Sequence, residues 1–182
     1  MPLVTISETK QYRPVNDQQS TMNTKPSLGD IEIIEFPATR IAVLEHRGAP
    51  QTLMASVSTF IEWRRLHGPS PKTSMTYNIL YDDPSAVAPE DYCFDICASI
   101  KVDVAANDFA VIEKIIPPGR CAVLRHIGSE AQLGAKIEYL YGNWLGQSSE
   151  NLRDFPCFLE RFTSYPDVPE HKMIIDIYLP IE

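Results

Sequence analysis

The stretch Arg40-Ile41-Ala42-Val43-Leu44-Glu45-His46-Arg47-Gly48 returns, 80 residues later, as Arg120-Cys121-Ala122-Val123-Leu124-Arg125-His126-Ile127-Gly128. Other landmarks recur at nearly the same interval: Pro89-Glu90 as Pro169-Glu170, Asp95-Ile96 as Asp176-Ile177, and Trp63 as Trp144. A duplication with so long a period predicts two copies of one supersecondary unit that bury a face against each other. We place the two copies over residues 31–100 and 109–181.

Each copy contains the same order of local patterns. Two apolar, β-branched runs separated by a proline predict strands, a helical pattern follows, and two further apolar runs predict two more strands. The expected strands are 31–36, 40–45, 75–81 and 92–100 in the first copy, and 109–116, 120–125, 158–162 and 173–181 in the second. The apolar helix positions expected on one face are Leu53, Val57, Phe60 and Ile61, and then Leu133, Ile137, Leu140 and Tyr141. The predicted fold is α+β: tandem β-α-β-β repeats form an antiparallel sheet with helices on one face. We expect a ligand cleft at the centre, where two edges and two helices meet.

Length, charge and composition exclude several classes of protein. The chain has 182 residues, a formal net charge of −8 and a sequence pI of about 5.0. This charge argues against binding along a nucleic-acid backbone, which needs clustered Lys and Arg. Residues 1–28 are polar and rich in turn formers, so we expect a flexible arm there and one domain over 29–182. No signal peptide and no apolar run of about 20 residues is visible, which predicts a cytoplasmic protein without a membrane span.

At this point residues 31–182 resemble a known family, the GyrI-like domains, and most closely the effector-binding domain of AraC-type transcription regulators. The phrases that carry the resemblance are the two nine-residue stretches above, Tyr81-Asp82-Asp83-Pro84, Phe94-Asp95-Ile96-Cys97, and Asp176-Ile177-Tyr178-Leu179-Pro180-Ile181. The resemblance implies a small-molecule-binding domain whose relatives bind amphipathic organic cations. Some relatives inhibit DNA gyrase, and a few hydrolyse reactive natural products.

The resemblance is incomplete at the N-terminus. Residues 1–28 are too short and too polar for the helix-turn-helix region of an AraC-type regulator. We therefore expect a stand-alone sensor or sequestering protein that does not bind nucleic acid directly. A homodimer and a separate regulator protein both remain open as partners.

Three carboxylates and one tyrosine on the later strands of the two halves are candidate ligand contacts. Asp176 lies in an apolar strand, where an unpaired charge is costly and a cationic ligand would relieve that cost. The alternatives are an internal pair with an arginine, for instance Arg40 or Arg120, and exposure on an open face of the sheet. Asp95 is the repeat equivalent of Asp176, and Glu160 is a further acid that alternates with apolar residues. Tyr178 lies on the same strand face as Asp176 and would suit a cation through its ring.

The remaining candidates are aromatic residues expected near the cleft: Trp63, Trp144, Tyr141, Tyr77, Tyr81 and Phe158. Core packing is the alternative for each of them. The two tryptophans come late in the two helices, so we expect them to form walls of a cleft between the halves.

No pattern predicts a catalytic, metal or cofactor site. His46 and His126 occupy equivalent places before Gly48 and Gly128, and duplicated positions favour a structural turn role over catalysis. The cysteines (Cys93, Cys97, Cys121 and Cys157) form no C-x-x-C pair, so we expect small core side chains. Two alternatives to a non-enzymatic binding domain stay open: a hydrolase in which Asp176 or Glu160 activates water, and a gyrase-inhibitor-like interaction with a protein.

Overall fold

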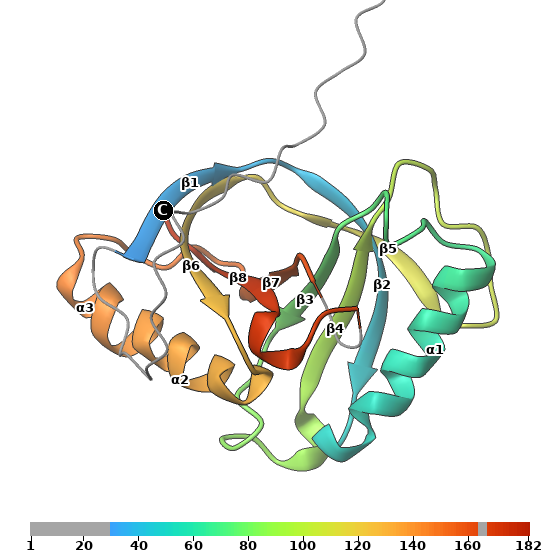
Figure 1. Ribbon diagram of the computed structural model, residues 1–182, viewed down its shortest axis with the longest axis horizontal. Helices are drawn as coiled ribbons and strands as arrows, with labels where there is room; N and C mark the ends of the chain where they lie inside the picture. Colours follow the sequence, from blue (N-terminus) through green and yellow to red (C-terminus); the bar gives the residue numbers. More distant parts are fainter. Residues whose placement is uncertain (1–29, 164–166) are drawn as a thin grey trace, which may run out of the picture.

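The computed structural model describes residues 30–163 and 167–182, which form one antiparallel sheet flanked by helices (Figure 1). The eight strands lie in the order β1-β6-β8-β7-β3-β4-β2-β5. Their bounds are β1 Ile31–Phe36, β2 Thr39–Arg47, β3 Thr76–Leu80, β4 Cys93–Ser99, β5 Val111–Ile116, β6 Gly119–Ile127, β7 Cys157–Arg161 and β8 Ile174–Pro180. The expected flexible arm over residues 1–28 lies outside the described residues.

One helical region follows β2 and another follows β6. The first is the 3₁₀ turn η2 (Pro50–Thr52) continued by α1 (Leu53–Leu66). The second passes from η4 (Glu130–Gln132) and α2 (Leu133–Glu138) through a π-helical stretch (Tyr139–Trp144) into α3 (Leu145–Gln147). Short 3₁₀ turns, η3 (Pro89–Asp91) and η6 (Glu170–Lys172), precede the last strand of each half. The α+β fold with tandem β-α-β-β units is therefore confirmed, as β2-α1-β3-β4 and β6-α2-β7-β8.

The first strand of each half is exchanged with the other half. β1 pairs with β6, with Ile34 opposite Cys121, while β5 pairs with β2, with Lys114 opposite Ile41. The strand order therefore reads the same from either end when the two halves are interchanged, with a pseudo-twofold axis between β3 and β7. The two sheet edges, β1 and β5, lie at opposite ends and not at the centre. The expectation that two edges meet at the cleft is wrong, because pairing of β3 with β7 joins the halves instead.

The two faces of the sheet have different roles. The helices cover one face in two separate places, where α1 packs over β2 and β4 and α2 packs over β6 (Figure 1). A buried cluster lies under each helical region, one containing Phe60 and Trp63 and the other Leu140 and Trp144. A third buried cluster holds side chains from both halves and none from the helices, including Phe36, Tyr77, Phe158 and Tyr178. We call the side of the sheet that carries this third cluster the helix-free face.

Two helix positions differ from the expected apolar face. Ile61 is 60% exposed, because it follows buried Phe60 by a single residue, about 100° around the helix. Tyr141 is 39% exposed and lies in the π-helical stretch, whose extra residue per turn shifts the face presented to the sheet.

The duplicated glycines and histidines shape the turns after β2 and β6. Gly48 and Gly128 have φ of 136° and 134°, a region that favours glycine. The ring of His46 lies 3.1 Å (Nε2) from the Gly48 carbonyl oxygen, and that of His126 lies 2.9 Å (Nε2) from the Ser129 carbonyl oxygen. Both rings are buried and bond to the turn that follows, as the structural interpretation predicts.

Candidate functional site

Alternation along the four central strands brings most of the candidate residues to the helix-free face. On β8, Ile175, Ile177 and Leu179 enter the core under the helices, so Asp176 and Tyr178 point the other way. The same alternation places Phe158 and Glu160 on β7, Tyr77 on β3 and Asp95 on β4 on this face, and Tyr81 follows β3 on the same side. The structure thus brings together seven of the ten sequence-predicted residues.

Four aromatic rings, Phe36, Tyr77, Phe158 and Tyr178, form what we call the central aromatic cluster. Phe158 and Tyr178 are directly paired across β7 and β8 and stack with centroids 4.8 Å apart and planes 4° apart. Phe36, at the end of β1, meets these two rings edge-on at 4.9 and 5.4 Å. All four side chains are buried, so the rings of the described chain fill this part of the face themselves.

Glu160 lies within this cluster and is 4% exposed. The Tyr178 hydroxyl donates to Glu160 Oε2 at 2.6 Å, and the Tyr77 hydroxyl lies 3.5 Å from Oε1. Burial, followed by the negative charge of Glu160, raises the pKa of both tyrosines above the ordinary value of 10. Both phenols therefore stay protonated at neutral pH and can donate to a carboxylate. The site is a negatively charged group held by hydroxyls and enclosed by aromatic rings.

Asp95 and Asp176 flank this centre in equivalent places but already have cationic partners. Arg125 binds Asp176 with two bonds of 2.7 Å, so the internal partner is neither Arg40 nor Arg120. Asp95 is fully buried and accepts from Arg47 at 2.8 Å and from Lys114 at 2.9 Å.

The Tyr81 hydroxyl also donates to Asp95, at 2.9 Å. Burial and this bond raise the pKa of Tyr81 to about 12. The guanidinium of Arg47 lies 5.3 Å from the ring centre of Tyr81, and that of Arg125 lies 5.1 Å from that of Phe162. Each half therefore places an arginine against its aspartate and against an aromatic ring, although Arg47 and Arg125 come from non-equivalent positions of the repeat.

Trp63, Trp144 and Tyr141 do not join this site. Trp63 stacks on Phe60 at 5.5 Å in the core under α1, whereas Trp144 belongs to the core under α2. The sheet separates both tryptophans from the central aromatic cluster, so the expectation that they wall a cleft between the halves is wrong. Each helix packs its tryptophan onto its own half.

Sequence reasoning missed four residues of the site: Phe36, Arg47, Lys114 and Arg125. Phe36 and Lys114 belong to the exchanged strands, so they reach the site from β1 and β5. The repeat itself carries a signal for the acid, because Glu160 corresponds to Ile79 in the first half. A charged residue that replaces the apolar one expected from a duplication indicates a local role beyond the fold.

Within the described ranges, no three His, Cys, Asp or Glu side chains group as they would around a metal ion. No helix in those ranges is long and apolar enough to cross a membrane.

The sequence matches a family model and known proteins. Residues 29–182 match the model of the GyrI-like small molecule binding domain. Over 153 residues the chain is 35% identical to the probable transcriptional regulator YgiV of Escherichia coli K12, and the match covers 84% of this chain and 96% of YgiV.

Solved structures share the fold at low identity. The EcmrR–DNA complex has a TM-score of 0.68 at 13% identity over 84% of this chain, which spans 57% of the EcmrR chain. The isolated EcmrR C-terminal domain has a TM-score of 0.65 at 12% identity, with 84% and 96% of the two chains covered.

Two further structures share the fold, one named a hydrolase and the other holding a bound ligand. A hydrolase from Listeria innocua has a TM-score of 0.52 at 13% identity, with 84% and 92% of the chains covered. SAV2435 bound to tetraphenylphosphonium has a TM-score of 0.50 at 11% identity, with 84% and 93% covered. At such identities these likenesses show the fold alone. With the family model matching nearly all of the described residues and a relative 35% identical over most of both chains, this chain belongs to the GyrI-like small-molecule-binding domain family.

Proposed function

We propose that the chain binds a lipophilic organic cation on the helix-free face and acts as a sensor or sequestering protein for it. The observation that carries the proposal is Glu160, a buried acid inside a cluster of aromatic rings. A cation placed beside it gains from the carboxylate and from the ring faces, and both attractions are stronger away from water. Tetraphenylphosphonium bound to SAV2435, which shares the fold, supports this ligand class.

Among the three acids of the face, the aromatic surroundings favour Glu160. Asp176 and Asp95 are each opposed by at least one cationic side chain at salt-bridge distance. Glu160 is buried beside the rings of Tyr77 and Tyr178 and accepts from the Tyr178 hydroxyl. A ligand cation beside Glu160 would therefore meet an oriented carboxylate and ring faces together.

Phe36 determines how a ligand reaches this acid. Its ring lies edge-on against the stacked pair of Phe158 and Tyr178 and is 5% exposed. A bound aromatic cation would displace the Phe36 ring and take over its contacts with the pair. We expect the end of β1 to move when the ligand binds.

The test uses two ions of the same size and shape but opposite charge. Isothermal titration calorimetry with tetraphenylphosphonium should show saturable binding, whereas tetraphenylborate should bind at least tenfold more weakly. Equal affinity for the two ions would mean that the face selects apolar surface and not charge.

A hydrolase is the second candidate, because a solved structure with this fold is named one and a buried carboxylate could activate water. In that case strained or activated electrophiles would be consumed catalytically, and Glu160→Gln would abolish turnover. Stoichiometric binding without turnover favours the binding role.

A further inference from the structure

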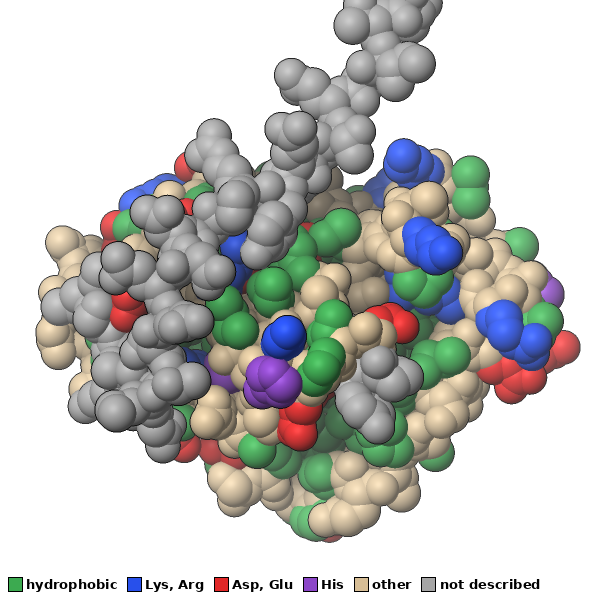
Figure 2. Space-filling view, in the orientation of Figure 1, with side chains coloured by type: hydrophobic (Ala, Val, Ile, Leu, Met, Phe, Trp, Pro, Cys, Tyr) green, Lys and Arg blue, Asp and Glu red, His purple; other side chains and the backbone are tan. Residues whose placement is uncertain are grey.

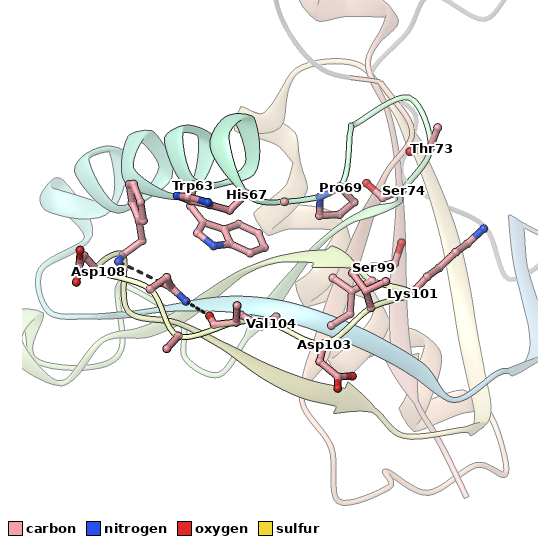
Figure 3. Close-up of a pocket in the computed structure, with 17 residues that line it drawn as sticks. Trp63, His67, Pro69, Thr73, Ser74, Ser99, Lys101, Asp103, Val104 and Asp108 are labelled. Carbon is pink, nitrogen blue, oxygen red and sulfur yellow. Dashed lines mark hydrogen bonds between the residues drawn. The ribbon is translucent and has the colours of Figure 1, made fainter.

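A cavity of about 480 Å³ lies in the first half, between the end of α1 and residues 99–109, which join β4 to β5 (Figure 3). Its walls include Trp63 and His67 from the end of α1, and Ile100, Val104 and Phe109 from the joining segment. It shares no lining residue with the central aromatic cluster. The volume is within the range of small-molecule sites.

Trp63 offers this cavity a hydrogen-bond donor. The residue is 3% exposed, and its indole points from α1 toward the segment that carries Val104 (Figure 3). In the described part of the chain, the indole N–H has no hydrogen-bond acceptor. Arg153 Nε is the one fully enclosed side-chain nitrogen or oxygen there that lacks a partner, so the indole nitrogen keeps some exposed surface, and Trp63 lines the cavity. A buried donor without an acceptor favours a ligand that supplies one.

Charges around the cavity favour an anionic acceptor. Arg64 is buried, and this burial lowers its pKa. Among the described residues its guanidinium donates to neutral oxygens of Pro69, Ser74 and Thr76. Two of these, Pro69 and Ser74, line the cavity, so a positive charge lies behind its wall.

Further charges lie at the rim. Lys101 lies at one end without a side-chain partner in residues 30–163 and 167–182, and Asp108 lies at the other end (Figure 3). Asp103 points away from Trp63 and pairs with Arg40. Lys and Arg side chains gather on this side of the molecule (Figure 2).

We infer that this cavity is a second ligand site, which takes a flat apolar molecule with a carboxylate. The apolar body would lie among Trp63, Val104 and Phe109. The carboxylate would accept from the Trp63 indole N–H and lie toward the Lys101 end, away from Asp108. The protein would then bind ligands of opposite charge at two places, an anion here and a cation on the helix-free face.

Three probes with one body separate charge from apolar contact: 3-phenylpropionate, 3-phenylpropionamide and 3-phenylpropylamine. Trp144→Phe leaves Trp63 as the reporter of the two tryptophans, and these probes do not absorb its excitation at long wavelength. The carboxylate should change Trp63 fluorescence saturably and bind at least fivefold more tightly than the amide, with the amine weakest. In calorimetry, Trp63→Phe should lose about fivefold in carboxylate affinity, because it keeps an aromatic ring but no N–H.

Lys101→Glu should lower carboxylate affinity at least threefold, while Lys172→Glu, the same charge change on an exposed turn elsewhere, should not. Saturating tetraphenylphosphonium should leave the carboxylate affinity unchanged, so this test stands whether or not the helix-free face binds cations. Equal binding of the three probes, equal effects of the two lysine variants, or no saturable binding up to about 10 mM would each overturn the inference.

Discussion

Replacing Asp95 by Asn should destabilise the fold more than the same change at Asp176. Asp95 is fully buried and holds Arg47, Lys114 and Tyr81, so it ties the exchanged strand β5 to β2 and β4. Removing one partner of a buried ion pair costs about 3–5 kcal/mol. The side chains of Arg47 and Lys114 are 40% and 29% exposed and both also contact Glu45, so water and Glu45 recover part of this cost. We expect a loss of about 2–3 kcal/mol for Asp95→Asn.

Asp176→Asn removes a single partner, Arg125, whose side chain is 32% exposed. We expect about 1–2 kcal/mol there, because a partly solvated pair contributes less. Asp108→Asn, on an exposed residue at the cavity rim, is the matched control and should change stability by less than about 0.5 kcal/mol. Urea unfolding with an unchanged m-value measures all three. If Asp95→Asn lowers the free energy of unfolding by no more than Asp176→Asn does, the contacts of Asp95 do not stabilise the pairing of β5 with β2 as argued.

The remaining predictions concern pH, packing and partners. Tyr81, Tyr77 and Tyr178 have raised pKa values, so the folded state holds their protons more tightly and stability should fall as pH rises from 10 toward 12; Tyr81→Phe should reduce this slope in urea melts at pH 9, 10 and 11. Phe36→Ala should cost about 3–4 kcal/mol of unfolding free energy, whereas Ile33→Ala, 47% exposed on the same strand, should cost less than about 1 kcal/mol. Gel-shift assays at physiological salt should show no duplex DNA binding, and salt-sensitive sub-micromolar binding would contradict the inference drawn from a net charge of −8.

The sequence predicted the strands and the two halves because a duplication repeats the same alternation twice. The exchange of β1 and β5 was not predictable, because the repeat interval is the same whichever half a strand pairs with. Pairing between distant strands depends on how both faces pack, and β1 reads Ile-Glu-Ile-Ile-Glu-Phe without a clear alternation that would fix its neighbour. For the same reason, the sequence did not predict that Phe36 and Lys114, which lie on the exchanged strands, reach the site.

The sequence predicted which residues of one strand share a face. It did not predict which residues of different strands and helices lie together. Period-2 alternation correctly placed Asp176 and Tyr178 on one face, whereas Trp63 and Trp144 were assigned to a shared cleft that their helices do not reach. The apolar strand around Asp176 predicts an unpaired charge, but Arg125, directly opposite in the neighbouring strand, pairs with it. A neutralising partner across a sheet cannot be identified until the register is known.

The most direct test of the central claim is the affinity of Glu160→Gln for tetraphenylphosphonium. The substitution keeps the side-chain shape and can keep a bond from Tyr178, so it removes mainly the negative charge. A hydrogen-bonded buried charge contributes about 1.5–3 kcal/mol, and calorimetry should therefore show affinity reduced roughly tenfold or more, with Asp176→Asn within about twofold of the unchanged protein. If Glu160→Gln binds the cation as tightly as the unchanged protein, or if Asp176→Asn alone loses binding, Glu160 is not the counter-charge of the site.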